Sequence, residues 1–332
     1  MPATLAALAG AAPAVTAGQL WLAYETGGYM YSDNLSDFLR IEVQARCRFR
    51  QFCDLPEQKG SNAQGKGEQF AWNIYGDLPD AANEGELAET DKMPTTRLEG
   101  SQGTCVVTEF GTAVPYSGKL DDLSAHPVRD IIKKSLERHC ARALDGRAHK
   151  QWAKTPLKVV PAAAGASATD VTITENGTAA SANDASMTAS HVSEIVLQMT
   201  ERDIPTHKHG DYYCIARPTT YRVLKKDLEN KQQYTETGFG RIVDGEKGRY
   251  DGVRFVDQTN IETAAWANGK SNDAYFFGDD VAAECCVIPE EIRGKIPDDY
   301  GRGKGVAWYY LGNFALTRTK AEDTRVIHWA TA

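Results

Sequence analysis

The sequence predicts an α+β fold built around one dominant helix and several scattered strands. Three observations lead to this class. A stripe of apolar residues with helical spacing runs through the middle of the chain, shorter apolar stretches lie on both sides of it, and polar, glycine-rich segments separate them. The length of 332 residues, with 42% hydrophobic and 25% charged residues, is typical of a globular protein of about two domains.

The dominant helix is expected at about residues 124–154. Ser124 is suited to the N-cap, and Pro127 falls in the first turn, where its missing N–H costs little. At about 1.5 Å per residue, a helix of roughly 28 residues spans about 40 Å. Its apolar stripe comprises Val128, Ile132, Leu136, Cys140, Leu144 and Trp152.

The opposite face of this helix is basic. Residues 124–154 carry eight bases and three acids, which gives +5 in a chain whose formal net charge is −8. A solvated helix face has this composition, and so does a surface that meets an acidic partner, either nucleic acid or the acidic segment of a neighbouring copy. The candidate contact residues are Arg129, Lys133, Lys134, Arg138, Arg142, Arg147 and Lys150.

Two extended stretches are expected before the helix. Residues 68–79 place Phe70 and Trp72 on one face at strand spacing, and residues 103–118 form a second extended piece. The connection between them is long and acidic, because residues 54–99 carry ten acids and four bases, a net charge of −6. We therefore expect a projecting hairpin.

A second helix is expected at residues 191–203 after a Thr/Ser entry, and residues 211–229 should form a strand, a turn at Pro218 and a short helix. Residues 36–54 fit either a helix or an extended arm. Further strands are expected at 249–262, 274–289, 305–319 and 325–332, with a short one at 170–174.

The loop at residues 60–67, GSNAQGKG, comes within one residue of the phosphate-binding P-loop motif. That motif needs a hydroxyl at its last position to ligate magnesium, and Gly67 stands there instead. A strand is predicted next, whereas a P-loop leads into a helix. Nucleotide binding is therefore not expected, and the glycines loosen the start of the hairpin.

No catalytic, cofactor or metal site is predicted. The seven cysteines include no CxxC pair, and their odd number does not suit a disulfide framework. His207, His209 and Cys214 lie close in sequence, but Lys208 between the histidines opposes a cation. No apolar run reaches the roughly 18 to 20 residues of a membrane span, so no membrane partner is expected.

Arg302 and Lys304 lie among three glycines just before an apolar strand. Glycines allow backbone N–H groups to face an anion, which makes both cations candidate anion contacts. A tight turn into the strand explains the same residues equally well.

Four segments resemble, in this order, the major capsid proteins of tailed double-stranded DNA bacteriophages, and the closest branch is the one typified by the podophage N-four. The segments are EFGTAVPYSGKLDDLSAHPVRDIIKKSLERHCARALDGRAHKQW, DYYCIARPTTYRVLKKD, RYDGVRFVDQTNIE and IPDDYGRGKGVAWYYLGNFALT. The resemblance covers about residues 35–332 and rests on structural motifs, so it implies a fold and no catalytic residue.

The resemblance implies the Hong Kong 97-type fold. Its parts would be an N-terminal arm at residues 1–52, an extended β-hairpin called the E-loop at 53–104, a peripheral domain with the long spine helix at 105–189, an axial domain at 190–290, and closing strands at 291–332 that return to the peripheral domain. The E-loop residues expected to contact a neighbouring subunit are Lys59, Lys66, Glu84, Glu86 and Glu89.

The resemblance also implies a function. Many copies would form the hexamers and pentamers of an icosahedral shell around packaged double-stranded DNA, contacted non-specifically, with assembly in the host cytoplasm and without a cofactor. A portal, a separate scaffolding protein and a decoration protein would be the partners. An encapsulin-like shell around a cargo enzyme is the alternative within this fold. A soluble enzyme or ligand-binding protein with an unrecognised site is the alternative outside it.

Overall fold

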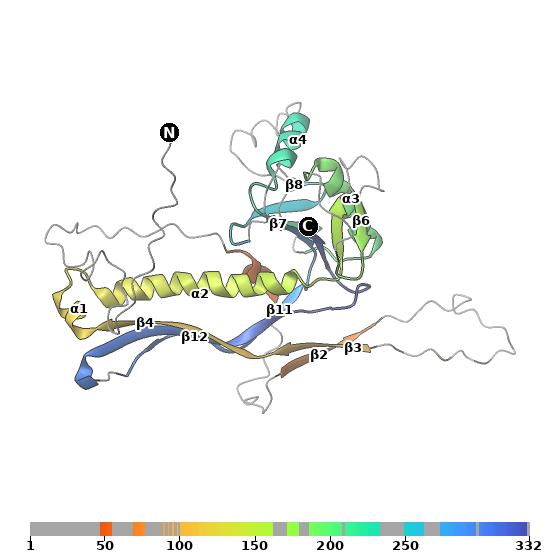
Figure 1. The fold of residues 1–332 in the computed structure, drawn as a ribbon. Coiled ribbons are helices and arrows are strands. Elements are labelled where there is room, and N and C mark those ends of the chain that lie inside the picture. Colours follow the sequence, from red (N-terminus) through yellow and green to blue (C-terminus); the bar gives the residue numbers. More distant parts are fainter. Residues whose placement is uncertain are drawn as a thin grey trace. The chain divides into compact units, whose positions relative to one another are not determined.

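Figure 1 shows the fold in a computed structural model of the chain. The described residues fall into two compact units. Among them, residues 109–140 and 288–310 make up the first unit, and the others make up the second. The structure describes residues 47–54, 69–76, 89, 92, 95, 98, 100–161, 171–178, 186–207, 210–232, 249–261, 273–296 and 299–330.

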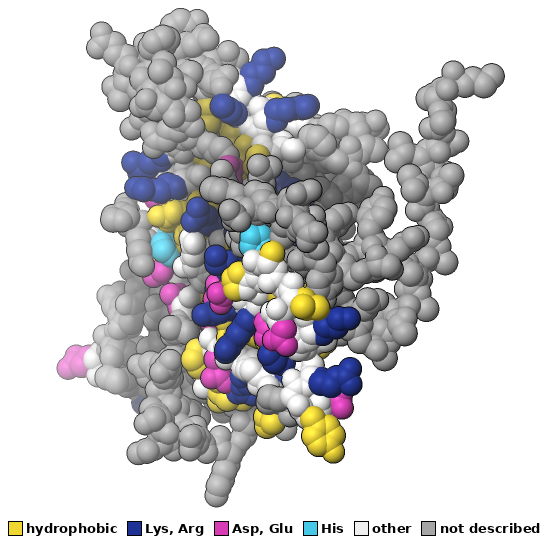
Figure 2. All heavy atoms as spheres, turned by 90° about the vertical axis from the view of Figure 1, so that its left-hand side faces the viewer, with side chains coloured by type: hydrophobic (Ala, Val, Ile, Leu, Met, Phe, Trp, Pro, Cys, Tyr) yellow, Lys and Arg dark blue, Asp and Glu magenta, His cyan; other side chains and the backbone are white. Residues whose placement is uncertain are grey.

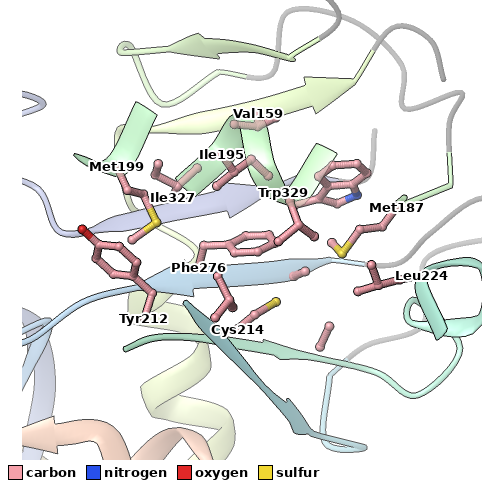
Figure 3. Close-up of a cluster of buried hydrophobic side chains, with 14 of the residues drawn as sticks. Val159, Met187, Ile195, Met199, Tyr212, Cys214, Leu224, Phe276, Ile327 and Trp329 are labelled. Carbon is pink, nitrogen blue, oxygen red and sulfur yellow. The ribbon is translucent and has the colours of Figure 1, made fainter. Parts of the chain in front are cut away.

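A seven-stranded mixed sheet forms the centre of the second unit. Its order is β6-β5-β13-β10-β7-β9-β8, with β13 parallel to β5 and β7 parallel to β9. Helices α3 (Ala189–Glu201) and α4 (Arg222–Gln232) contribute to one buried cluster with this sheet, as Figure 3 shows. The strands are β5 (Lys158–Pro161), β6 (Val171–Thr174), β7 (Tyr212–Ala216), β8 (Arg249–Tyr250), β9 (Val253–Asp257), β10 (Ala274–Phe277) and β13 (Val326–Trp329).

Successive side chains of β10 point to opposite faces of this sheet, and both faces are covered. Ala274 and Phe276 belong to the cluster that α3 and α4 share, where Figure 3 labels Phe276. Tyr275 and Phe277 contact Trp152 instead, with ring centroids 6.3 and 4.7 Å from the indole. All four β10 side chains are 0% exposed, so this strand lies in the middle of the core.

The second unit also contains the hairpin of β2 (Gln69–Tyr75) and β3 (Gly100–Val106), which pair antiparallel from Gln69 opposite Val106 to Tyr75 opposite Gly100. The 3-10 helix η3 (Phe49–Phe52) and the short strand β1 (Cys53–Asp54) precede it in the chain. A hairpin is therefore confirmed, although its second strand shares only residues 103–106 with the stretch predicted for it.

The first unit contains most of β4 (Thr108–Ser117), all of helix α1 (Gly118–Leu123) and the 3-10 helix η7 (Asp299–Gly301). It also contains parts of three elements that continue into the second unit. These are helix α2 (Val128–Trp152) and strands β11 (Ala282–Gly294) and β12 (Gly303–Leu316). Strands β4, β11 and β12 belong to a four-stranded sheet, whose order is β1-β11-β12-β4.

The buried stripe of α2 winds around the helix. Its members recur every four residues from Val128 to Trp152, and each is at most 6% exposed. Four residues correspond to about 400° of helix, so the stripe turns by about 40° per step and about 240° in all. In the first unit His139 accepts a hydrogen bond from Trp308 at 3.1 Å, and in the second Trp152 packs on Tyr275. The buried side chains therefore lie on different sides of the helix in its first and second halves.

The expected start of the dominant helix was wrong by one turn. The helix begins at Val128, and the carbonyl of Pro127 accepts hydrogen bonds from the backbone N–H groups of Asp130 and Ile131 at 3.2 and 3.3 Å. Ser124 is not its N-cap, because the hydroxyl of Ser124 accepts from the N–H of His126 at 3.2 Å. Ser124 instead ends the short helix α1, which the sequence did not predict.

Two predicted strands are each divided between two sheets. Residues 274–289 form β10 and the first part of β11, and residues 103–118 contain the end of β3 and all of β4. The first break occurs at Gly278, where an added Cβ would come within 2.0 Å of the Pro205 carbonyl oxygen. The helices predicted at 191–203 and after Pro218 are confirmed as α3 and α4. The seven-stranded sheet also takes β5, β6 and β13 from outside residues 190–290.

Candidate interaction surfaces

The basic face of α2 is open to solvent. Of the three acids in this helix, Asp145 is 1% exposed and lies inside, so only two acids remain at the surface beside seven bases. Arg138 is half-buried. The exposed bases are Arg129, Lys133, Lys134, Arg142, Arg147 and Lys150. The helix therefore presents positive charge that its own carboxylates do not balance.

Asp145 joins three separate segments of the second unit. Its carboxylate accepts hydrogen bonds from the backbone N–H of Arg50 at 3.3 Å, from Gln258 Nε2 at 2.6 Å and from Asn260 Nδ2 at 3.1 Å. Burial raises the pKa of this carboxyl above its usual value, although the hydrogen bonds act in the opposite direction. Asp145 thus fixes η3 and the loop after β9 to α2.

Two aromatic side chains anchor η3 to the seven-stranded sheet. In a 3-10 helix residues i and i+3 lie on the same side, which brings Phe49 and Phe52 to one face. Phe49 meets Tyr275 edge-on with ring centroids 5.5 Å apart, and Phe52 meets Phe277 in the same way at 5.0 Å. The chain is therefore held firmly at the point where the predicted N-terminal arm ends and the predicted E-loop begins.

Arg50 adds a charged anchor between these two rings. Its Nε and Nη2 donate to the carboxylate of Glu284 at 3.1 and 2.8 Å. The side chains are 31% and 7% exposed, so the acid is nearly buried. A two-pronged Arg–carboxylate pair is among the stronger hydrogen-bonded contacts in proteins. Releasing η3 would leave the carboxylate of Glu284 buried without this cation.

The base of the β2–β3 hairpin is held by Trp72. Its Nε1 donates to the carbonyl of Thr317 at 2.9 Å, and its ring lies over Gly103, directly opposite in the register. A Cβ at Gly103 would come within 2.2 Å of the indole, so only glycine fits there. The sequence predicted the inward face of β2 but missed Gly103. The signal that could have found it is a strand glycine paired with an aromatic residue.

The two cations predicted to contact an anion each face a carboxylate in the first unit. Lys304 Nζ lies 2.7 Å from Asp121 Oδ2, and the guanidinium of Arg302 lies 3.8 Å from Asp299. The carbonyl of Arg302 also accepts a hydrogen bond from the N–H of Gly118 at 2.8 Å. Anion binding by Arg302 and Lys304 stays a prediction, and an anion would have to compete with these carboxylates.

Large apolar side chains are exposed in the same unit. Ile296 is 87% exposed and Tyr300 is fully exposed, and Ile292 at the end of β11 is 39% exposed. Asp299, Tyr300 and Gly301 have φ values of 48°, 53° and 90°, a run that non-glycine residues rarely adopt. Figure 2 shows a face on which yellow apolar side chains lie among dark-blue and magenta charged ones. These exposed apolar side chains make this part of the first unit a candidate contact surface.

The predicted E-loop contacts fall mostly outside the described residues. This applies to Lys59, Lys66, Glu84 and Glu86, to the GSNAQGKG loop and to the predicted N-terminal arm up to residue 46. Glu89 is described and is exposed in a turn.

Within the ranges that the structure describes, no group of three or more His, Cys, Asp or Glu residues could hold a metal ion. None of the helices in those ranges is both long enough and apolar enough to cross a membrane.

Comparison with known proteins gives matches in structure. No family model and no curated protein matches the chain. The capsid of the cyanophage P-SCSP1u matches with a TM-score of 0.63 and 11% identity over 91% of this chain and 93% of that chain. A structure from Mycobacterium phage Che8 matches with a TM-score of 0.65 and 12% identity over 90% and 96%. The capsid of Ralstonia phage GP4 matches with a TM-score of 0.63 and 14% identity over 94% and 98%.

The chain has the Hong Kong 97-type fold. The matches extend over at least 90% of both chains, so they are not confined to one part of the chain. The predicted fold class is confirmed.

Proposed function

We propose that the chain is the major capsid protein of a tailed double-stranded DNA bacteriophage. One observation carries this proposal: the fold is like that of phage capsid chains from end to end, over at least 90% of both partners in each comparison. A fold alone is compatible with several functions. The surfaces of this chain favour a structural role, because the described residues expose basic and large apolar side chains.

In this proposal α2 is the spine helix, and the β2–β3 hairpin with its connection is the E-loop. The anchors around Phe49, Arg50 and Trp72 support that role, since they fix both ends of a segment that is expected to reach a neighbouring subunit. The seven-stranded sheet with α3 and α4 corresponds to the axial domain. A standard protein interface buries about 1,600 Å², so several such contacts per subunit give a stable shell without any single tight one.

The basic face of α2 is proposed to meet an acidic partner. Two partners fit: residues 54–99 of a neighbouring copy, with their net charge of −6, and packaged DNA, which is contacted without sequence specificity. Both contacts weaken in salt. They differ in one measurable respect, because empty shells keep the protein contact and lack the DNA contact. Salt-induced dissociation at the same ionic strength in empty and filled shells would support the neighbouring copy.

The further partners in this proposal are a portal, a separate scaffolding protein and a decoration protein on the finished shell. Assembly would take place in the cytoplasm of the host bacterium.

The test is electron microscopy of the purified full-length chain, produced with and without the neighbouring genes of its genome. Closed icosahedral shells that contain DNA after infection are the expected result. Shells that carry a cargo enzyme and no genome would support an encapsulin-like compartment instead. A small soluble oligomer under all conditions would overturn the proposal of a shell protein.

A further inference from the structure

A cavity of about 380 Å³ opens beside α4 in the second unit. Its floor is apolar and consists of Tyr221, Leu224, Leu228 and Phe255. Tyr221 offers it no hydroxyl, because that group donates to the carbonyl of Cys214 at 2.8 Å. The volume lies in the range of roughly 300–1,000 Å³ that is typical of binding pockets. Chemically, the floor suits an aliphatic or aromatic group.

The rim of this cavity is basic. Arg222 and Lys225 line it, and both are exposed residues one turn apart on α4. An apolar floor with cations at its edge favours an apolar side chain that has carboxylates beside it.

Helix α3 carries a side chain of this description. Leu197 is 51% exposed, although Ile195 and Met199 on the same helix are fully buried. Glu194 and Glu201 lie three residues before and four residues after Leu197, so all three side chains share one face of the helix. This face of α3 therefore presents a leucine between two acids.

The leucine and the cavity belong to the same unit but cannot meet within one copy. Ile195 and Met199 of α3 and Leu224 and Leu228 of α4 belong to one buried cluster, which Figure 3 shows in part. Leu197 is on the solvent side of α3, away from that cluster. A second copy of the chain is therefore the occupant that the charges and the apolar surfaces favour.

We propose that Leu197 of one copy occupies the α4 cavity of the next copy, with Glu194 and Glu201 facing Arg222 and Lys225. The two surfaces differ, so the contact is head-to-tail, and such a contact closes a ring when the rotation between neighbouring copies divides a full turn. The inference rests on the proposed function, because it requires that the chain assembles with itself. In this arrangement, the same contact holds each copy to the next.

The test is disulfide cross-linking between copies. Leu197→Cys and Thr219→Cys place one thiol on α3 and one on the exposed edge of the cavity. The two single variants are co-assembled under reducing conditions and then oxidised by dissolved oxygen with a copper catalyst. Each disulfide forms as two thiols lose two protons and two electrons to oxygen. Dimers that dithiothreitol reverses are expected for the mixture, and higher ladders are expected for the double variant.

The wild-type chain and each single variant alone are the controls for the native cysteines. Absence of the mixed dimer in particles that assemble normally would overturn the inference and leave the proposed function intact. Absence of particles for the wild-type chain would overturn the proposed function itself.

A second measurement decides the matter if the cysteine variants do not assemble. Glu194→Lys with Glu201→Lys should lower particle yield at least about tenfold, because like charges then meet across the contact. Adding Arg222→Glu and Lys225→Glu to the same chain should restore most of the yield. Normal yield for the first pair, or no restoration by the second, would overturn the inference.

Discussion

Strands β10 and β11 follow one another in the chain, yet their side chains are buried to very different extents. All of β10 is fully buried, and β11 begins in the same way at Ala282. Its outer half is exposed, with Val287 at 51% and Ile292 at 39%. The seven-stranded sheet thus has a strand that is buried on both faces, whereas the outer half of β11 keeps exposed apolar side chains. A subunit of a shell is expected to combine these two properties.

The largest expected loss of stability comes from removing a large side chain from the buried core around β10. Trp152→Ala removes the ring that packs against Tyr275 and Phe277, and it should lower the free energy of unfolding by about 3–5 kcal/mol. Guanidinium unfolding of the unassembled subunit measures this. Val287→Ala is the matched control on β11 and should change stability by less than about 0.5 kcal/mol. Equal losses for both variants would remove the contrast between the two strands.

The next effect concerns the anchor of η3. Arg50→Ala leaves the carboxylate of Glu284, 7% exposed, without its guanidinium partner, and should cost about 3 kcal/mol. Adding Glu284→Gln to this variant should recover part of the loss, because the remaining group is then neutral. A double-mutant cycle from urea unfolding measures the coupling. A coupling energy near zero would show that the pair does not hold η3.

A smaller effect is expected at the break between β10 and β11. Gly278→Ala brings a Cβ against the Pro205 carbonyl oxygen and should cost about 1–3 kcal/mol. Gly294→Ala at the far end of β11 meets no atom within 4 Å and is the matched control. Thermal unfolding of both variants compares the sites. A stable Gly278→Ala protein would mean that the junction can shift.

The smallest expected change in stability is at Asp211, and it depends on pH. Hydrogen bonds and charge from Arg254 and Arg249 hold the pKa of Asp211 below its usual value of 3.8. The folded carboxylate therefore stabilises the protein above pH 3.8, and this contribution is lost as pH falls through the lowered folded pKa. Asp211→Asn should lower the urea midpoint at pH 7, and the deficit should shrink below pH 3.8.

Asp145 is the control for Asp211, because burial raises its pKa and its contribution to stability should therefore change with pH in the opposite direction. There the folded state binds the proton more tightly than the unfolded state. The wild-type protein should gain stability relative to Asp145→Asn as pH falls from neutrality through the raised folded pKa. The same pH trend in both variants would contradict this assignment of the two carboxyls.

Much of the fold followed from periodicity, and the remainder depended on contacts distant in sequence. The stripe of α2 and the alternation in β2 are local patterns; β2 formed where it was expected, and α2 began one turn later than expected. The break at Gly278 was not predicted, because its cause is a carbonyl 73 residues earlier in the chain, at Pro205. The buried position of Asp145 was equally hidden, since it depends on donors from Gln258 and Asn260.

The candidate surfaces were predictable only in part. The bases of α2 could be found by helical spacing, and the structure leaves most of them exposed. Helical spacing separates Leu197 from the apolar face of Val192, Ile195 and Met199, and the structure leaves Leu197 51% exposed. The cavity beside α4 was not predicted, because Phe255 of β9 lines it together with residues of α4, and the two segments are distant in sequence.

The central claim is that the subunit folds by itself and is completed by other copies. Sedimentation of the wild-type chain beside Lys134→Glu/Arg142→Glu tests it most directly, because both bases are exposed on α2. We expect wild-type shells of megadalton size. The variant should stay unassembled, with an unfolding free energy within about 0.5 kcal/mol of the wild-type subunit. A wild-type chain that sediments as a small oligomer would contradict the account, whereas a variant that forms normal shells would leave packaged DNA as the partner of the basic face of α2.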